Sequence, residues 1–82
     1  MPDKPVQVTA YSGYRGEESP RSFMVGGKRV EVRKILARWI EEDEATAERS
    51  RWFRVKGDDF RVRVLRCRER DGIWFMEEDG EK

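Results

Sequence analysis

The chain has no histidine and a single cysteine, Cys67, among its 82 residues. One cysteine excludes a disulfide framework, and the lack of histidine excludes the usual zinc sites and histidine-dependent nucleophiles. No run of about 20 apolar residues occurs, which excludes a membrane-spanning helix. No positively charged and then apolar leader opens the sequence, so we expect no secretory signal. These absences predict a soluble, cytoplasmic protein without a disulfide, a metal or a cofactor.

Apolar residues are scarce, since 37% of the residues are hydrophobic and 43% are charged. A chain of this length buries only about 60% of its unfolded surface, so we expect a thin core in one domain over residues 1–82, ordered from about residue 6 to 78 with flexible termini. Such a core leaves little room for a substrate pocket. The carboxylate clusters Glu17-Glu18, Asp58-Asp59 and Glu77-Glu78-Asp79 lie in expected turns or terminal segments. We therefore predict that the chain is not an enzyme.

The charges are nearly balanced in number but are segregated along the chain. Eighteen basic and 17 acidic residues give a formal net charge of +1. Segments 21–40 and 49–70 carry net charges of +5 and +6, whereas segments 41–48 and 71–82 carry −5 and −4. Such blocks can form a basic surface on a nearly neutral protein, or they can neutralise one another after folding. The sequence leaves both alternatives open.

Alternation of apolar and polar residues with a period of two predicts strands along most of the chain. Turn signals at Gly26-Gly27, at 56–59 and at Asp71-Gly72 separate these strands. The alternation slips by one residue near Arg33-Lys34, which predicts a β-bulge there. We therefore expect an all-β fold, either a bent antiparallel sheet or a small, partly open barrel of five to six strands.

The segment 34–50 is compatible with two structures. Ile35, Leu36, Trp39 and Ile40 fit the apolar stripe of a helix, and helix-favouring Glu and Ala residues follow them. The odd-numbered residues from Ile35 to Trp39 also continue the strand alternation. We favour a strand to about Trp39, followed by a charged loop at 41–51 that can contain one helical turn, with a helix over this segment as the alternative.

The same alternation predicts the core. Its main members are expected to be Phe23, Val25, Val30, Val32, Phe53, Val55, Phe60, Val62, Val64 and Leu65. Cys67 alternates with Leu65 and is expected to be a small core residue rather than a reactive thiol. The adjacent apolar pair Val64-Leu65 predicts that the strand changes its inward parity there, so that the arginines on both sides point outward.

Outward side chains of the C-terminal third form the main candidate site. If a turn at 56–59 closes a hairpin with Val55 opposite Phe60, Trp52 lies opposite Arg63. A tryptophan beside arginines on a sheet surface is a platform on which unpaired bases stack while phosphates meet the guanidinium groups. The predicted nucleic-acid face consists of Trp52, Arg54, Arg61, Arg63, Arg66 and Arg68. These residues indicate a non-catalytic module that binds single-stranded nucleic acid or another polyanion.

Alternatively, the same arginines can be engaged in ordinary contacts within the protein rather than in ligand binding. Arg63 can lie over Trp52 as a cation–π pair. If the next hairpin places Arg68 opposite Phe75, Arg66 can pair with Glu77 across it. The acidic segment 41–48 can cover the remaining charges. The basic residues would then be neutralised within the protein.

A second candidate site is the loop from Tyr11 to Arg21. Its candidate contact residues are Tyr11, Tyr14, Arg15 and Glu17. Tyrosine and arginine anchor many protein interfaces, and an exposed strand edge can pair with a partner strand. Alternatively, both tyrosines pack over one end of the barrel. This loop supports the alternative function of a protein–protein interaction module.

The run Tyr11-Ser-Gly-Tyr-Arg-Gly-Glu-Glu-Ser-Pro-Arg is the most specific motif of the chain. Together with spaced hydrophobic residues over roughly residues 6–76, it resembles a family of small bacterial domains of unknown function. The resemblance implies the fold and a bacterial cytosolic setting, and it implies no activity. The acidic segment before Trp52 and the arginines around Cys67 depart from the family pattern.

Overall fold

The computed structural model describes residues 4–12 and 18–78. Neighbouring strands are antiparallel, in the order β1-β7-β6-β5-β4-β3-β2. The strands are β1 (Lys4–Pro5), β2 (Val8–Ser12), β3 (Glu18–Val25), β4 (Lys28–Glu42), β5 (Arg49–Gly57), β6 (Val62–Arg68) and β7 (Trp74–Glu78). The all-β prediction is confirmed, with seven strands instead of five to six and no helix in these residues. The described part of the chain accordingly contains no helix able to cross a membrane.

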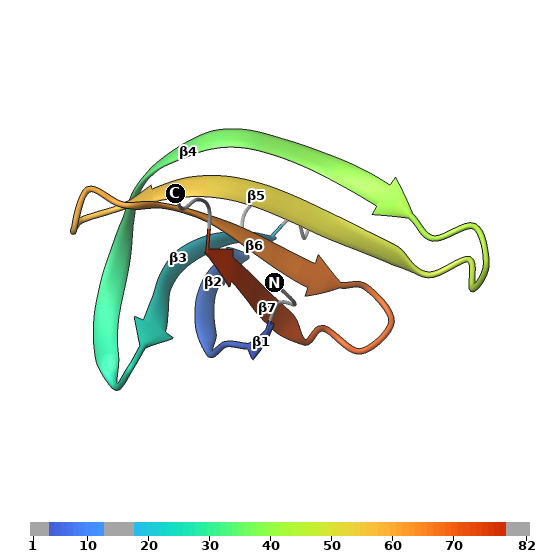
Figure 1. Cartoon of the computed structure of the whole chain (residues 1–82), viewed down its shortest axis with the longest axis horizontal. Helices are drawn as coiled ribbons and strands as arrows, with labels where there is room; N and C mark the ends of the chain where they lie inside the picture. Colours follow the sequence, from blue (N-terminus) through green and yellow to red (C-terminus); the bar gives the residue numbers. More distant parts are fainter. Residues whose placement is uncertain (1–3, 13–17, 79–82) are drawn as a thin grey trace.

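The sheet curls strongly into an open half-barrel (Figure 1). Its bend lies in the 15-residue strand β4, which pairs with β3 over its first residues and with β5 from Val32 onward. The pairing with β5 shifts between Val32 and Lys34 and again between Ile35 and Ala37. Such bulges bend a strand and increase its twist. The bulge predicted near Arg33-Lys34 is confirmed.

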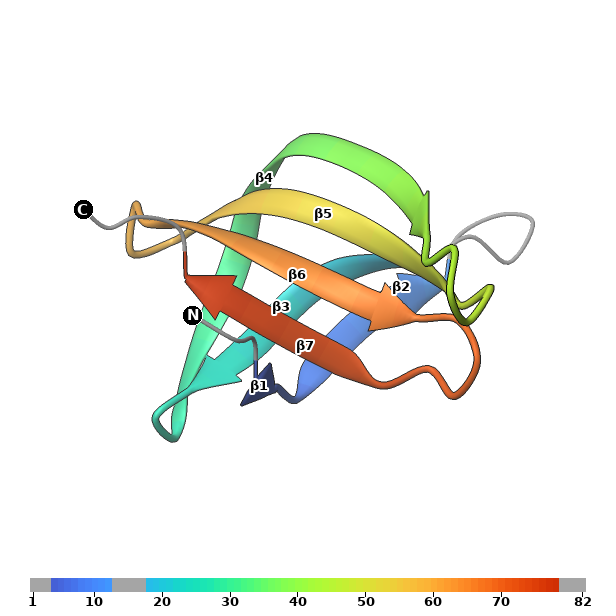
Figure 2. The same ribbon diagram turned by 45° about the vertical axis from the view of Figure 1, so that its right-hand side comes forward.

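The N-terminal segment contacts both edges of the curled sheet (Figure 2). β1 pairs with β7 and β2 pairs with β3, although only two residues separate β1 from β2. Between them, the Val6 amide donates to the Trp74 carbonyl at 3.0 Å, and the Gln7 carbonyl accepts from the Met24 amide at 3.0 Å. The two edges of the sheet therefore come close together at this segment.

Residues 34–50 are strand on both sides of a short connection. β4 continues through Glu42 and β5 begins at Arg49, so the expected loop at 41–51 is reduced to residues 43–48. Within the connection, the Ala47 amide donates to the Asp43 carbonyl at 2.6 Å, which closes a single α-turn rather than a helix. At the other end of β4, Gly26 and Gly27 have φ values of 55° and 79° and form the predicted tight hairpin turn.

Apolar side chains on the inner face of the curled sheet form the core. The buried members are Phe23, Val30, Phe53, Val55, Leu65, Cys67, Trp74 and Met76. The rings of Phe53 and Trp74 lie 5.7 Å apart between centroids. Val25 and Val32 pack at the margin of this cluster. The prediction that Cys67 is a core residue is confirmed.

The β5–β6 hairpin has a different register from the predicted one. β5 continues through Gly57, and Val55 lies opposite Arg63, not opposite Phe60. A β-carbon at Gly57 would lie 2.6 Å from Val30 Cγ1, so close packing requires glycine at this strand position. The predicted pairing is therefore wrong by three residues, because a glycine that packs against the core was interpreted as part of the turn.

This odd shift exchanges the faces expected for Val62, Arg63 and Val64, because side chains alternate along a strand. Pairing with β5 is continuous from Val62 to Arg68, so the predicted change of parity at Val64-Leu65 is wrong. Val62 and Val64 lie on the outer face instead of in the core, while Arg63 is buried. Phe60, also predicted in the core, is 76% exposed.

The β6–β7 hairpin differs from the prediction by two residues. Arg66 lies opposite Phe75 and Val64 lies opposite Glu77, so the predicted partners Arg68 for Phe75 and Arg66 for Glu77 are wrong. The connection is longer than a tight turn and spans residues 69–73. An even shift does not exchange the faces of a strand, and Arg66 and Arg68 remain on the outer face.

Candidate functional site

The structure separates one residue of the predicted nucleic-acid face, Arg63, from the other five. Trp52 and Arg66 lie directly opposite each other on the outer face of β5 and β6. Arg54 and Arg68 lie on the same face, on either side of this pair. Arg61 is exposed in the turn between the two strands. Only the sixth residue, Arg63, is placed inside the fold.

Arg63 is 2% exposed and is the largest of the fully buried side chains. Its guanidinium carbon lies 5.4 Å from the centroid of the Phe23 ring, and its Nη2 lies 2.9 Å from Asp59 Oδ2. The hydrogen bond from Arg63 lowers the pKa of Asp59 below its ordinary value, against a smaller opposing effect of desolvation. The prediction that Arg63 points outward is therefore wrong. Arg63 holds the β5–β6 turn from the inner face of the sheet, through its ion pair with Asp59.

Four directly paired side chains form a row across the outer face, which we call the outer row: Trp39, Trp52, Arg66 and Phe75. The two indole rings are stacked, with centroids 5.9 Å apart and an interplanar angle of 9°. The Arg66 guanidinium carbon lies 5.7 Å from the Trp52 ring and 4.4 Å from the Phe75 ring. Contacts of this kind are worth about 0.5–2 kcal/mol each. Trp52 is thus stacked between two side chains of the protein itself.

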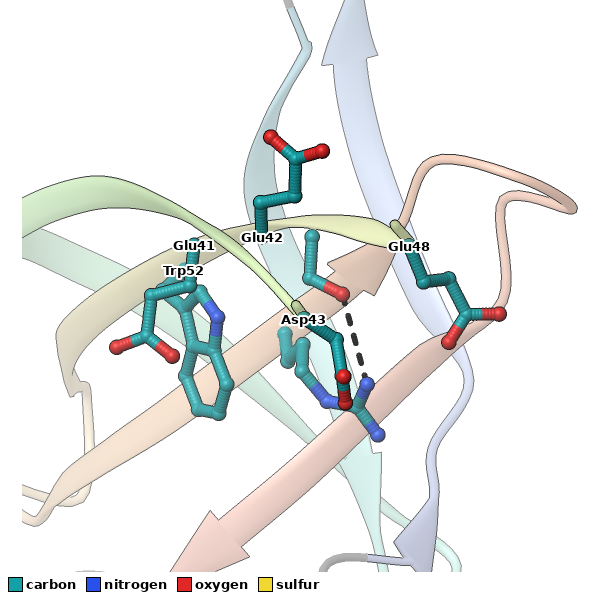
Figure 3. Close-up of a pocket in the computed structure, with 7 residues that line it drawn as sticks. Glu41, Glu42, Asp43, Glu48 and Trp52 are labelled. Atoms are coloured by element: carbon teal, nitrogen blue, oxygen red, sulfur yellow. Dashed lines mark hydrogen bonds between the residues drawn. The ribbon is translucent and has the colours of Figure 1, made fainter. Parts of the chain in front are cut away.

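A pocket of about 160 Å³ lies beside the outer row. Figure 3 shows that the carboxylates of Glu42 and Glu48 point in different directions around it. Arg66 Nη1 donates to Ser50 Oγ at 3.5 Å within the pocket. Its lining residues are Glu41, Glu42, Asp43, Glu48, Ser50, Trp52 and Arg66. The described residues contain no cluster of three or more acidic, cysteine or histidine side chains that could hold a metal ion.

Ion pairs neutralise several arginines near the β6–β7 connection. The pairs are Arg68–Asp71 at 2.8 Å, Arg70–Glu48 at 3.2 Å and Arg51–Glu69 at 3.3 Å. The hydrogen bond from Arg68 lowers the pKa of Asp71 to about 2, and the same bond raises the pKa of Arg68. Around the β6–β7 connection, these arginines are therefore neutralised within the protein.

Basic side chains gather on the other side of the outer row, towards the β5–β6 turn. Lys34 lies directly opposite Lys56, and both side chains face outward because their neighbours Ile35 and Val55 pack inward. Arg54 lies two residues from Lys56 on the same face of β5. We call Lys34, Arg54 and Lys56 the basic end; Arg61 is exposed in the adjoining turn. Asp58 and Asp59 are both exposed acids of the turn, and Asp59 is bound by Arg63.

Phe60 extends from the turn beside the basic end. Gly57 and Arg61 close this turn through a hydrogen bond of 2.9 Å from the Gly57 amide to the Arg61 carbonyl. Phe60 adopts a left-handed φ of 66°, is 76% exposed, and has Lys56 Nζ 5.8 Å from its ring centroid. The turn thus places an exposed aromatic ring next to a pair of lysines.

Three of the four candidate contact residues in the loop from Tyr11 to Arg21 fall outside the part of the chain that the structure describes. Tyr14, Arg15 and Glu17 lie outside the described residues. Tyr11 belongs to β2, where it is paired with Ser19 of β3. The protein-binding hypothesis for this loop stays a prediction.

No family model, no curated protein and no solved structure matches the chain. The resemblance to a family of small bacterial domains therefore also stays a prediction. The fold and the side-chain geometry alone support the function proposed below.

Sequence reasoning missed three residues of the candidate site: Lys34, Lys56 and Phe60. The signal for the two lysines was present, because Lys34 precedes Ile35 and Lys56 follows Val55 in alternating strands. Their cross-strand pairing depends on two bulges in β4, whose combined effect on register has no clear sequence signal. No pattern in the sequence indicated that Phe60 is exposed. Its exposure depends on where the β5–β6 turn begins and ends.

Proposed function

We propose that the chain is a non-catalytic binding module that contacts single-stranded nucleic acid through the basic end of its outer sheet face. The observation that carries this proposal is the direct opposition of Lys34 and Lys56. Like charges placed opposite each other on a sheet destabilise the pair by a few tenths of a kcal/mol or more. A phosphate between them turns this repulsion into attraction.

The arrangement of neighbouring charges fits a chain of phosphates better than a single anion. Arg54 lies beside Lys56 along β5, and Arg61 lies at the turn. Successive side chains on one face of a strand are about 7 Å apart, which is close to the spacing of phosphates along an extended nucleic-acid strand. Arg54 and Lys56 can therefore contact consecutive phosphates, with Lys34 beside Lys56.

The rest of the outer face limits where such a ligand can bind. The carboxylates around the pocket repel phosphates at one end, and Arg68 is already paired with Asp71. The ligand is thus directed to the basic end, on the opposite side of the outer row. This revises the site expected from the sequence: Arg54 remains in it, Arg61 lies in the adjoining turn, Arg63 is buried, and Arg68 is paired with Asp71.

The test is binding of a labelled single-stranded oligonucleotide of about 15 nucleotides, measured by fluorescence anisotropy at two salt concentrations. We expect affinity to fall steeply between about 50 and 200 mM salt, because each phosphate contact releases counterions. Lys34→Gln and Lys56→Gln should each weaken binding and reduce the salt dependence. Lys28→Gln is the matched control, since Lys28 is an exposed lysine in the β3–β4 hairpin.

Two results would overturn the proposal. One is the absence of binding at low salt, where electrostatic attraction is strongest. The other is an equal loss of affinity in the Lys28 and Lys56 variants, which would indicate attraction by net charge without a defined site.

A further inference from the structure

We infer that Phe60 is a base-stacking residue, so that the ligand of the basic end is a strand with unpaired bases rather than a base-free polyanion. This inference rests on the proposed function and deepens it. It starts from a conformation that folding alone does not explain. Phe60 combines a left-handed backbone with a side chain that is 76% exposed.

The left-handed region is unfavourable for a bulky residue, because its β-carbon approaches the following carbonyl oxygen. In short hairpin loops this position is ordinarily filled by glycine, which has no such penalty. Phenylalanine therefore makes the turn less stable than glycine would. The exposed ring buries too little apolar surface to compensate, so the residue is better explained by a role in binding.

The turn that presents Phe60 is firmly held. The Phe60 amide donates to the Gly57 carbonyl at 3.0 Å, and the Asp58 amide donates to the Glu31 carbonyl of β4 at 2.8 Å. Asp59 accepts hydrogen bonds from the Arg61 amide at 3.1 Å and from the buried Arg63 at 2.9 Å. The ring is consequently displayed from a fixed position, which reduces the entropy lost on binding.

The surroundings of the ring match the two parts of a nucleotide. Lys56 Nζ lies 5.8 Å from the ring centroid, and Lys34 lies opposite Lys56 across the strand pair. A base that stacks on Phe60 would therefore have two lysines nearby for its flanking phosphates. Stacking of this kind is independent of sequence, because every base has a π-face.

Two ligands of equal phosphate number separate stacking from charge: a deoxythymidine oligonucleotide of about 15 nucleotides and an abasic strand of the same length. We expect the wild-type protein to bind the base-containing strand about five- to 100-fold more tightly, the effect of one or more stacked bases. Phe60→Gly should remove this difference and leave affinity for the abasic strand unchanged.

Ala47→Gly is the matched control, because Ala47 also has a left-handed φ, 60°, in the connection at the far end of β5. Both glycine variants relieve the backbone, so we expect the thermal midpoint of each to be equal to or higher than that of the wild type. Ala47→Gly should keep the preference for bases. Phe60→Leu, which keeps an apolar side chain without a ring, should lose most of it.

Several outcomes would overturn the inference. They are equal binding of both strands by the wild-type protein, equal weakening of both by Phe60→Gly, unchanged preference in Phe60→Leu, and a lower thermal midpoint of Phe60→Gly. The first of these leaves the proposed function intact, because the abasic strand would still bind through its phosphates. Failure of the wild-type protein to bind either strand at low salt would overturn the proposed function itself.

Discussion

Arg63 Nη2 lies 2.9 Å from Asp59 Oδ2, and the two side chains differ sharply in exposure: 2% for the arginine and 36% for the aspartate. The pair therefore joins the core to the surface turn. Removing a charge from water is costly, and here the cost falls mainly on the arginine, which also packs over Phe23. The contributions of packing and of charge to this contact can be separated by mutation.

Arg63→Ala should lower the free energy of unfolding by about 2–4 kcal/mol, because it leaves a cavity beside Phe23 and removes the partner of Asp59. Arg63→Met should cost less than half as much. Methionine refills most of the volume, and the half-exposed Asp59 regains water. Urea unfolding of both variants measures the two values. Equal losses would show that the ion pair, not the packing, dominates.

Asp59 should make stability depend on pH. The hydrogen bond from Arg63 lowers the pKa of Asp59 in the folded state. Its contribution is therefore fully present above the unfolded-state pKa, about 4, and is lost as the pH falls through the lower folded-state value. Urea unfolding at several values from about pH 6 to about pH 2 should show that wild type and Asp59→Asn converge at the acid end.

Asp71 offers a second measurement of the same kind. Its pKa of about 2 lies below that of an ordinary aspartate, because Arg68 donates to its carboxylate. The stability difference between wild type and Asp71→Asn should likewise decrease as the pH falls below about 4. A difference that stays constant over this range for either variant would contradict the assigned ion pair.

Gly57 should not tolerate a side chain while Val30 is present. A β-carbon there would lie 2.6 Å from Val30 Cγ1 and 2.8 Å from Asp59 Oδ1. We expect Gly57→Ala to cost about 1–3 kcal/mol, the usual range for overpacking. In a Val30→Ala background the nearest atom is absent, so the same substitution should cost at least about 0.5 kcal/mol less. Additive losses in this double-mutant cycle would contradict the close contact.

The strands were predictable because local patterns determine them. Alternation identified most strands, and Gly26-Gly27 and the slip at Arg33-Lys34 identified a turn and a bulge, each of which depends only on neighbouring residues. The register of the β5–β6 hairpin was not predictable in this way. Gly57 is required by a contact with Val30, which is distant in the sequence.

The side chains of the candidate site, like the strands, were predictable where they depend on local alternation. Trp52, Arg54 and Arg66 were correctly placed on the outer face, because they alternate with buried residues. Arg63 was misplaced because an arginine is rarely buried, and only the tertiary structure supplies Phe23 and Asp59 as its partners. Phe60 was wrongly expected in the core because of the error in the register of the β5–β6 hairpin.

The stacked pair of Trp39 and Trp52 should stabilise the fold beyond the sum of the two side chains. Their rings are nearly parallel, with centroids 5.9 Å apart. We expect a double-mutant cycle with Trp39→Ala and Trp52→Ala to give a coupling free energy of about 0.5–1.5 kcal/mol in urea unfolding. The coupling should be insensitive to salt, because neither side chain is charged.

Ile40 supplies the control for this cycle. It follows Trp39 in β4, is 55% exposed and pairs with Arg51 on the opposite face of the sheet. Ile40→Ala and Trp52→Ala should therefore be additive to within about 0.5 kcal/mol. Coupling of equal size in both cycles would mean that Trp52 acts through the backbone of the β4–β5 pair. Coupling in the tryptophan cycle alone would show that the outer row is held by contacts between its own rings.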